Sequence, residues 1–329
     1  MEQIEIFGWM VYPYSLTVTL AGALLCLGWG AARACRTGLS ARAAAWGAVL
    51  GGLLAAVLAR VTSCLCDWEW LTMEGVGYFV SFGDGGWMPV GALLGLALGL
   101  ALAARLGRAS FGKLADAFAA PFLLFAALCH VADGLAGEGF GWGVDDWLAP
   151  DGGMSLVAME DASFFHRLPF AVGNYYGEWR WAVFVLMALV LLALCRVVCR
   201  RRDMREGGTA CLAALLYACA TVLGESLRQD TMIKWSFVRC AQLLCALVVL
   251  ALLILCAARS GARGGDLIKS AALTFGGALI VIAMEFALEG KIGAIEWMTM
   301  DVCYCFTTLG CVLMALGVGR LWKRAFAKG

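Results

Sequence analysis

Apolar positions along the chain gather into nine long runs separated by short polar segments. A helix needs about 20 consecutive apolar residues to cross the hydrocarbon core of a bilayer, and each run is of that order. The pattern therefore predicts an all-α, polytopic membrane helix bundle. The nine predicted transmembrane spans are residues 11–32, 43–62, 87–104, 114–133, 180–199, 209–226, 236–257, 268–288 and 302–322.

Positive charges fall in alternate loops between these spans. Under the nine-helix reading, 18 of the 25 Lys and Arg residues lie on one side, and most of the acidic residues lie on the other. Cytoplasmic loops of membrane proteins are enriched in Lys and Arg. We therefore expect the N-terminus outside and the C-terminus in the cytoplasm, which agrees with an odd number of spans. The basic side carries Arg33, Arg36, Arg42, Arg105, Arg108, Lys113, Arg196, Arg200, Arg201, Arg202, Arg205, Arg259, Arg263, Lys269, Arg320, Lys323, Arg324 and Lys328.

The spans divide into two groups. Residues 1–257 are expected to form a seven-helix membrane core, whose one long outer loop, at about 134–179, has the composition of an ordered cap. Residues 258–329 are expected to add a basic loop and two further helices, which could form a separate appendage.

Composition agrees with a membrane protein and excludes several other classes. The chain is 62% hydrophobic and 15% charged, whereas soluble domains are about 45–50% apolar and about 25% charged. No basic domain with aromatic platforms is present, so we expect no nucleic-acid partner. The acidic start of the chain lacks the basic region of a cleavable signal peptide, and the first span is expected to remain as a helix.

Fifteen cysteines are distributed mainly within the spans, where they act as small apolar residues. Two Cys-x-Cys pairs, Cys64 with Cys66 and Cys303 with Cys305, are expected at the outer face. They can be incidental, form an extracytoplasmic disulfide or bind a metal, and the sequence leaves these alternatives open. We assign no metal site and no cofactor.

Ionisable residues within or beside the spans are candidates for a functional site, because they are costly in a membrane. His130 and Asp133 lie three residues apart at an outer helix end and share one helix face, and Glu225 with Arg228 repeats that spacing. Each pair can be a structural salt bridge, or can belong to a polar pocket that opens outward. In such a pocket a histidine beside a carboxylate can act as a general base, and an arginine can hold a phosphate.

Several segments together resemble the prolipoprotein diacylglyceryl transferase family. "GDGGWMPVGALLG" (83–95) is similar to the family's W-D-G-G-x-x-x-H-G-G, "SFGKLADAFAAP" (110–121) to its S-x-x-x-x-x-D-x-x-A-P, and "HVADGLAGEGFG" (130–141) to its G-R-x-G-N-F-x-N-G-E-x-x-G. "LLYACATVLGESLRQD" (215–230) resembles Y-G-x-x-R-x-x-x-E-x-x-R, and "HRLPF" (166–170) is a loose echo of R-H-P. The resemblance covers about residues 10–257 and implies seven helices with the N-terminus outside.

The resemblance implies a set of site residues, with departures at important positions. Where the family has a histidine and two arginines, this chain has Val90, His130 and Thr221, and Asp133 replaces an asparagine. Implied catalytic positions are His130, Asp133 and Glu138. Implied substrate-binding positions are Tyr14, Arg60, Asp84, Gly85, Gly86, Gly137, Gly141, Tyr217, Glu225 and Arg228.

By this resemblance the protein is a divergent transferase of the bacterial cytoplasmic membrane. It would move the diacylglyceryl group of phosphatidylglycerol to the thiol of a lipobox cysteine in a precursor protein. A related transfer or hydrolysis at a lipid headgroup is a variant of this hypothesis. The alternative is a non-catalytic paralogue, or pseudoenzyme, that binds lipid or a lipoprotein precursor. A small-solute transporter is less favoured, because the chain lacks paired broken helices and two-half symmetry.

Overall fold

The computed structural model describes residues 4–6, 9–81, 86–145, 163–174, 177–201, 204–230, 233–235, 238–291 and 298–327. Within these ranges nine helices are long and apolar enough to cross a membrane, and each overlaps one predicted span. The predicted polytopic helical fold is thereby confirmed, whereas the orientation of the termini stays a prediction. The nine helices are α1 (Pro13–Arg36), α2 (Ala41–Cys66), α4 (Pro89–Leu106), α5 (Phe111–Ala136), α7 (Val183–Arg200), α8 (Gly208–Leu227), α9 (Cys240–Ser260), α10 (Gly265–Leu288) and α11 (Met300–Phe326).

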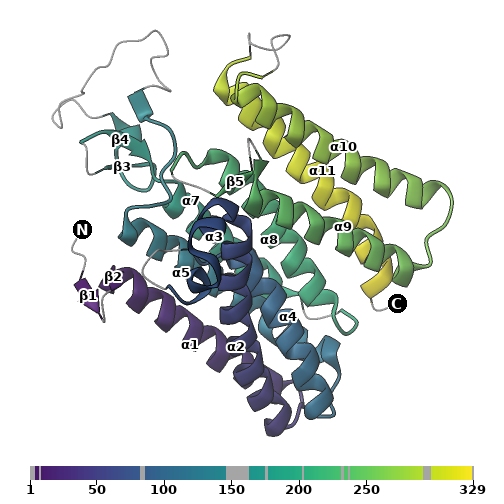
Figure 1. The fold of residues 1–329 in the computed structure, drawn as a ribbon. Coiled ribbons are helices and arrows are strands. Elements are labelled where there is room, and N and C mark those ends of the chain that lie inside the picture. Colours follow the sequence, from purple (N-terminus) through teal and green to yellow (C-terminus); the bar gives the residue numbers. More distant parts are fainter. Residues whose placement is uncertain are drawn as a thin grey trace.

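The long helices run between two chemically different ends of the bundle (Figure 1). At one end, called the basic end, lie the loops that carry most of the Lys and Arg side chains. At the other, called the cap end, α5 and α8 finish and the short elements gather. These are α3 (Trp68–Glu74), the 3-10 turns η1 (Gly75–Val80) and η3 (Phe164–His166), and the antiparallel hairpins β1–β2 (Ile4–Ile6 with Trp9–Val11), β3–β4 (Ala171–Gly173 with Trp179–Trp181) and β5–β6 (Lys234–Trp235 with Val238–Arg239).

Local sequence explains where several helices begin and end. Pro13 and Pro89 occupy the first turns of α1 and α4, where a missing N–H is tolerated. The Ser110 side chain accepts a hydrogen bond from the backbone N–H of Lys113 and so caps the start of α5. Gly137 ends α5 at a φ of 87°, a left-handed conformation that favours glycine.

Close helix packing explains part of the high glycine content. On α4, three glycines spaced four residues apart face α2. A Cβ on Gly95 would lie 2.0 Å from the Leu54 carbonyl oxygen, and one on Gly99 would lie 2.3 Å from that of Leu50. Small residues at this spacing let the backbones of two membrane helices approach closely. Close backbone packing is therefore a main contribution to the α2–α4 contact.

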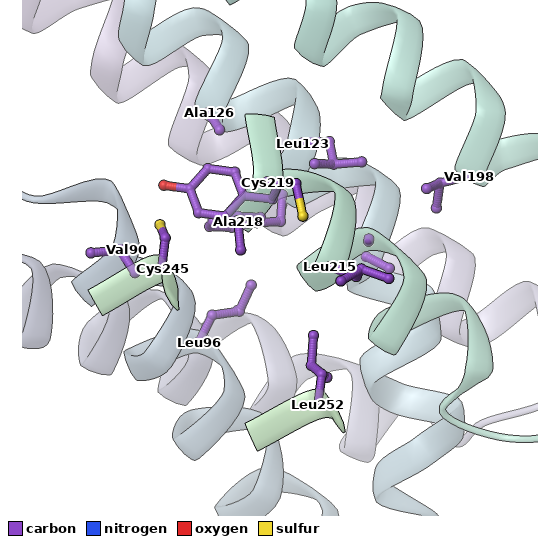
Figure 2. Packing of buried hydrophobic residues seen from close by; sticks show 14 of the residues in the cluster. Val90, Leu96, Leu123, Ala126, Val198, Leu215, Ala218, Cys219, Cys245 and Leu252 are labelled. Atoms are coloured by element: carbon purple, nitrogen blue, oxygen red, sulfur yellow. The ribbon is translucent and has the colours of Figure 1, made fainter. Parts of the chain in front are cut away.

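Helix α5 is the centre of the bundle. It packs against α1, α4, α7 and α8, and Phe118 and Leu123 on it are fully buried. The apolar cluster around it includes Leu215 and Ala218 of α8 and Cys245 of α9 (Figure 2). Because α5 and α8 pack against each other, the residues at their shared cap end are brought together.

Helices α10 and α11 form a tight antiparallel pair that lies along one side of the bundle (Figure 1). Gly277 and Gly310 mark their closest approach, since a Cβ on Gly277 would lie 2.4 Å from the Gly310 carbonyl oxygen. Helix α11 in turn packs against α8 and α9, and its Trp322 donates an indole hydrogen bond to the Gly208 carbonyl at 2.7 Å. The pair is therefore in direct contact with the preceding helices.

Candidate functional site

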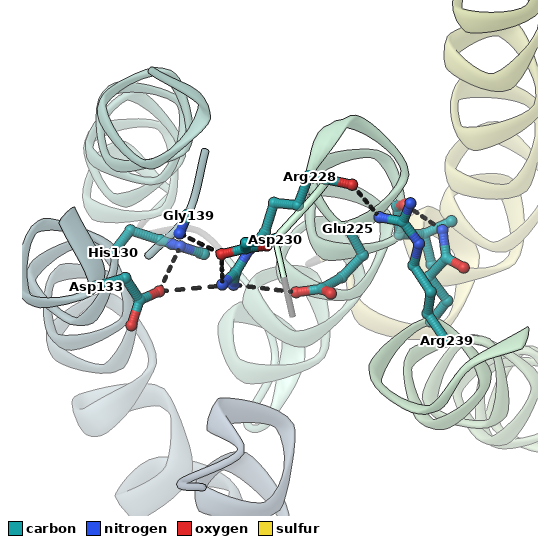
Figure 3. A network of polar contacts seen from close by, with 9 residues as sticks. His130, Asp133, Gly139, Glu225, Arg228, Asp230 and Arg239 are labelled. Carbon is teal, nitrogen blue, oxygen red and sulfur yellow. Dashed lines mark hydrogen bonds and ion pairs between the residues drawn. The ribbon is translucent and has the colours of Figure 1, made fainter. Parts of the chain in front are cut away.

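Arg228, at the C-terminal cap of α8, is the hub of a polar network at the cap end (Figure 3). Its guanidinium makes two hydrogen bonds to Asp230, at 2.8 and 3.1 Å. It also lies 3.7 Å from a carboxylate oxygen of Asp133 and 3.7 Å from one of Glu225. Only 12% of the Arg228 side chain is exposed. One buried cation thus serves three carboxylates.

His130 and Asp133 join this network from α5. The His130 Nδ1 atom lies 3.4 Å from the Asp133 Oδ2 atom, and the same Oδ2 atom faces Arg228. His130 is buried, with 7% of its surface exposed. The two pairs that the sequence placed on separate helices therefore form one continuous network, in which Asp133 links the imidazole to the guanidinium.

A glycine-rich turn after α5 closes the network from the cap side. Gly139 has a φ of 79°, and its N–H donates to the Asp230 carboxylate. A Cβ on Gly141 would lie 2.8 Å from the Val183 side chain, so the chain can pass there only without a side chain. Glycine at Gly137, Gly139 and Gly141 thus lets the backbone approach both α7 and Asp230.

Glu138 lies in this turn, and the residue is exposed although neighbouring atoms crowd its carboxyl group. Burial raises the pKa of Glu138 above its ordinary value, and the negative charges of Asp133 and Asp230 act in the same direction. The positive charge of Arg228 lowers the pKa of Glu138 in opposition. The surroundings therefore raise the pKa of the Glu138 carboxyl group on balance.

The charges of the network are unequal. Four acidic side chains, Asp133, Glu138, Glu225 and Asp230, surround Arg228 and His130. The only further arginine drawn in Figure 3, Arg239, is 4% exposed and donates to the backbone carbonyl of Arg228 at 2.7 Å. In this state the site offers acid–base groups in abundance and little uncompensated positive charge.

Arg60 lies apart from the Arg228 network and has a different environment. Its guanidinium donates to the carbonyl oxygens of Tyr78 and Ser81, both at 2.6 Å, and to that of Gly86 at 3.1 Å. It also lies 4.9 Å from the centre of the Tyr78 ring. With 3% of its surface exposed, Arg60 ties the end of α2 to the segment that leads into α4.

The other residues implied by the resemblance take separate positions. Tyr14 is 66% exposed at the start of α1. Tyr217 is 1% exposed and packs edge-on against Phe122, with 5.1 Å between ring centres. Gly86 lies beside Ser63 and Arg60. Asp84 and Gly85 fall outside the described residues.

The departures from the family pattern are also placed. Val90 is 1% exposed within α4, and Thr221 is 6% exposed within α8. Val90 stands at the position of the family histidine and Thr221 at that of a family arginine, and neither side chain can carry a charge. His130 and Asp133 are the two departures that put titratable side chains into the network.

Sequence reasoning missed three parts of the site. The first is the hydrogen bond from the Gly139 N–H to Asp230, which joins residues far apart in the sequence. The only sequence signal for Asp230 as a site residue was its position two residues after Arg228. Glu285 of α10 accepts hydrogen bonds from Ser226 and from Gln242, the latter at 2.9 Å. An acidic residue within an apolar span was a usable signal for Glu285.

The third missed part comes from α11. The Tyr304 hydroxyl donates to the Ser226 carbonyl at 3.2 Å and accepts from the Trp142 indole at 2.8 Å. Ser226 lies directly after Glu225 in α8. Two side chains of the last helix pair, Glu285 and Tyr304, therefore contact the segment that carries Glu225 and Arg228.

Two polar residues in the other segments that resemble the family have local roles. Asp116 accepts hydrogen bonds from the backbone N–H groups of Gly207 and Ala210, at 2.8 and 2.7 Å, and so caps the start of α8 at the basic end. His166, in the "HRLPF" segment, contacts Ser163 and Asp145, both at 2.9 Å. Both are therefore accounted for by structural contacts.

The cysteines of the two Cys-x-Cys pairs are free thiols. Cys64, Cys66 and Cys303 are buried free thiols, and Cys305 is exposed. Among the described residues, no group of three or more His, Cys, Asp and Glu side chains is arranged to hold a metal ion.

The fold and the network define a multi-pass membrane protein with a cluster of ionisable side chains at the cap end of the helix bundle. The sequence model of the prolipoprotein diacylglyceryl transferase family matches residues 2–258. Because this match covers most of the chain, the protein belongs to that family. It is a transferase family of the membrane, acting on phospholipid and prolipoprotein substrates. A search of curated proteins found no match.

Proposed function

We propose that this chain transfers the diacylglyceryl group of phosphatidylglycerol to the thiol of a lipobox cysteine. The observation that carries the proposal is the His130–Asp133–Arg228 network, which lies in the segments that resemble the family's signature motifs. The substrates would be the membrane lipid and a precursor protein at the cap end, in a bacterial cytoplasmic membrane.

His130 would act as the general base. Asp133 faces its Nδ1 atom, so the Nε2 atom is left to accept the thiol proton, and the carboxylate stabilises the imidazolium that forms. The thiolate then attacks the glycerol carbon of the lipid that bears the phosphate. The new C–S bond forms as the C–O bond breaks, and glycerol phosphate leaves with the bonding electrons.

Arg228 would stabilise the phosphate of the leaving group, and this role requires an exchange of partners. Its guanidinium already binds Asp230 through two donors. Protonation of Glu138, whose pKa is raised, would lower the negative charge around Arg228 and so favour a phosphate beside it. Some of the guanidinium N–H groups of Arg228 could then donate to the lipid phosphate instead of to Asp230.

The same contacts favour a second candidate function, a non-catalytic family member that binds lipid or a lipoprotein precursor. Arg60 is held by three backbone carbonyls and Arg228 by three carboxylates. With Val90 and Thr221 in place of charged family residues, the cationic grip on a phosphate would be weaker than the family pattern implies.

A lipidation assay separates the two candidates. The host's own transferase is depleted, this chain is expressed, and lipidation of a precursor is measured together with growth. If the chain restores lipidation, His130→Ala and Asp133→Ala should each lower the rate by about 10²–10⁴-fold, as expected for a positioned acid–base group. If the unmodified chain is inserted in the membrane yet transfers nothing, the catalytic proposal is rejected in favour of the binding protein.

The chain offers a matched control in its second histidine. His166 is also buried at the cap end and also contacts an aspartate. His166→Ala should leave transfer near the parent rate. An equal loss in both histidine variants would show general damage to the cap end and would remove the support for His130 as the base.

His130→Arg, which restores the family residue, separates two roles of this position. A gain in activity would indicate that the position grips phosphate. A loss would indicate that it moves a proton.

A further inference from the structure

A cavity of about 260 Å³ lies at the basic end, between the start of α10 and the end of α11. It is at the opposite end of the helices from the Arg228 network, and both of its helices lie beyond the family match at residues 2–258. It is lined by Asp266, Ser270, Arg320, Leu321, Lys323 and Arg324.

Three of the lining side chains are cations and one is an anion. Arg324 lies 2.6 Å and Arg320 lies 3.8 Å from the Asp266 carboxylate. About half of each arginine side chain is exposed, so the single carboxylate of Asp266 leaves part of both lining guanidinium groups open to solvent. Lys323 makes no ion pair with any described residue. The lining therefore has an excess of positive charge.

The buried wall of the cavity carries an unused hydrogen-bonding group. Ser270 is 1% exposed, and its hydroxyl has no hydrogen-bond partner among the described residues. Helix packing fixes its position, because Gly317 lets α11 approach so closely that a Cβ there would lie 2.7 Å from the Ser270 carbonyl oxygen. A buried polar group without a partner costs free energy, and such a group in a cavity is satisfied when a ligand fills it.

We propose that this cavity binds the phosphate group of an anionic phospholipid. Arginine and lysine donors at the rim and a hydroxyl on the wall are the groups that bind phosphate oxygens. Basic pockets between transmembrane helices, close to the membrane surface, bind the headgroups of anionic lipids. The volume admits a phosphate with part of a glycerol, and the acyl chains remain outside.

The neighbouring surface favours a lipid over free phosphate. Ile268, which lies between Asp266 and Ser270 in the sequence of α10, is 68% exposed, and Phe275, five residues after Ser270, is 52% exposed. An apolar surface of this kind beside a charged cavity fits a ligand with a phosphate and hydrocarbon chains. The bound lipid would anchor the basic end of the α10–α11 pair in the membrane leaflet that contains the lipid.

Native mass spectrometry of the delipidated full-length protein in neutral detergent tests the site. Phosphatidic acid is the probe, because it carries a phosphate but lacks the glycerol headgroup of the proposed transferase substrate. Phosphatidylcholine is the zwitterionic comparison. Arg320→Gln and Lys323→Gln should each weaken phosphatidic acid binding about fivefold, the effect of one cation close to an anionic lipid. Arg36→Gln removes an exposed cation at the same end on α1 and should have no effect.

Asp266→Asn gives a change of opposite sign. It removes the carboxylate that competes for Arg320 and Arg324, so phosphatidic acid should bind more tightly than to the parent. Ser270→Ala should weaken binding while thermal stability stays at or above the parent value, because the mutation also removes an unsatisfied hydroxyl.

The proposal is overturned if Arg320→Gln, Lys323→Gln and the control Arg36→Gln change lipid binding equally, since the effect would then be one of general charge. It is also overturned if Asp266→Asn weakens binding. If inorganic phosphate occupies the site at millimolar concentration and phosphatidic acid does not, the cavity is a site for a free anion and the lipid assignment is wrong.

Discussion

Replacement of Arg228 by glutamine tests whether the cap-end network is held by one buried cation. The side chain keeps most of its length and some hydrogen bonding but loses its charge. Asp133, Glu225 and Asp230 would then face one another without a cation between them, at positions now 2.8–3.7 Å from the guanidinium.

The magnitude follows from burial. The Arg228 side chain is 12% exposed, and those of Asp230 and Glu225 are 11% and 9% exposed. Removal of one partner from a buried ion pair costs about 3–5 kcal/mol, because the remaining charge stays buried without compensation. We expect Arg228→Gln to lower the free energy of unfolding by about that amount at neutral pH.

The loss should depend on pH in a defined direction. Burial raises the pKa of Glu138, and Arg228 is the nearby charge that opposes this shift. A carboxyl group with a raised pKa in the folded state contributes stability when it is protonated, and this contribution disappears as the pH rises through the folded-state pKa. Without Arg228 the pKa of Glu138 rises further. The deficit of Arg228→Gln should therefore be largest at neutral pH and shrink as the pH falls.

Unfolding followed by tryptophan fluorescence in detergent at several pH values measures both effects. Arg180→Gln is the matched control, since Arg180 pairs with Glu178 at the same end with 32% and 53% of the two side chains exposed. An exposed pair contributes about 0–1 kcal/mol. If the two variants are equally stable, or if the stability deficit of Arg228→Gln grows on acidification, Arg228 is not the cation that holds the network together.

Further predictions concern packing, the last helix pair and topology. Gly95→Ala should separate α2 from α4 and lower the unfolding midpoint in detergent, because its Cβ would meet the Leu54 carbonyl, whereas Gly276→Ala, with no atom near its Cβ, should not. Tyr304→Phe should reduce lipidation activity if α11 positions the end of α8, and unchanged activity would contradict that role. Removal of residues 263–329 should leave seven membrane-inserted helices that are recoverable in detergent. A reporter fused after Arg202 should be cytoplasmic and one inserted near Gly152 extracytoplasmic, and the reverse pattern would refute the orientation.

The membrane spans were predictable because the bilayer imposes a length and a composition that a sequence displays directly. Helix α3 and the turn η1 were not predicted. Both are short, and none of the residues of α3 is buried. The sequence therefore shows no periodic pattern of apolar residues there that would predict a helix. Trp68 and Trp70 there are exposed side chains typical of a membrane interface rather than a core.

Within the site, local pairs were predictable and the links between them were not. The spacing of His130 and Asp133 places them on one helix face, and the structure has them 3.4 Å apart. That Asp133 also reaches Arg228 depends on how α5 crosses α8, which no short motif specifies. Glu285 could have been singled out by the rule that charged residues are rare within membrane spans. Its contacts to Ser226 and Gln242 could not, because they depend on tertiary packing.

The network gives the departures from the family pattern a common physical meaning. An arginine at position 130 and an asparagine at 133 would add a cation and remove an anion beside Arg228. With His130 and Asp133 instead, the positive charge of the site comes from Arg228, Arg239 and whatever proton His130 carries, against four carboxyl groups. Because Asp133 contacts both His130 and Arg228, the two substitutions act as a unit: the carboxylate that suits a histidine base is the same one that competes with a phosphate for the arginine. Under the proposed function, a chain with this pair would give up part of its hold on the lipid phosphate in exchange for an imidazole that can accept the thiol proton, and its activity should depend more steeply on pH than on phosphate-binding charge.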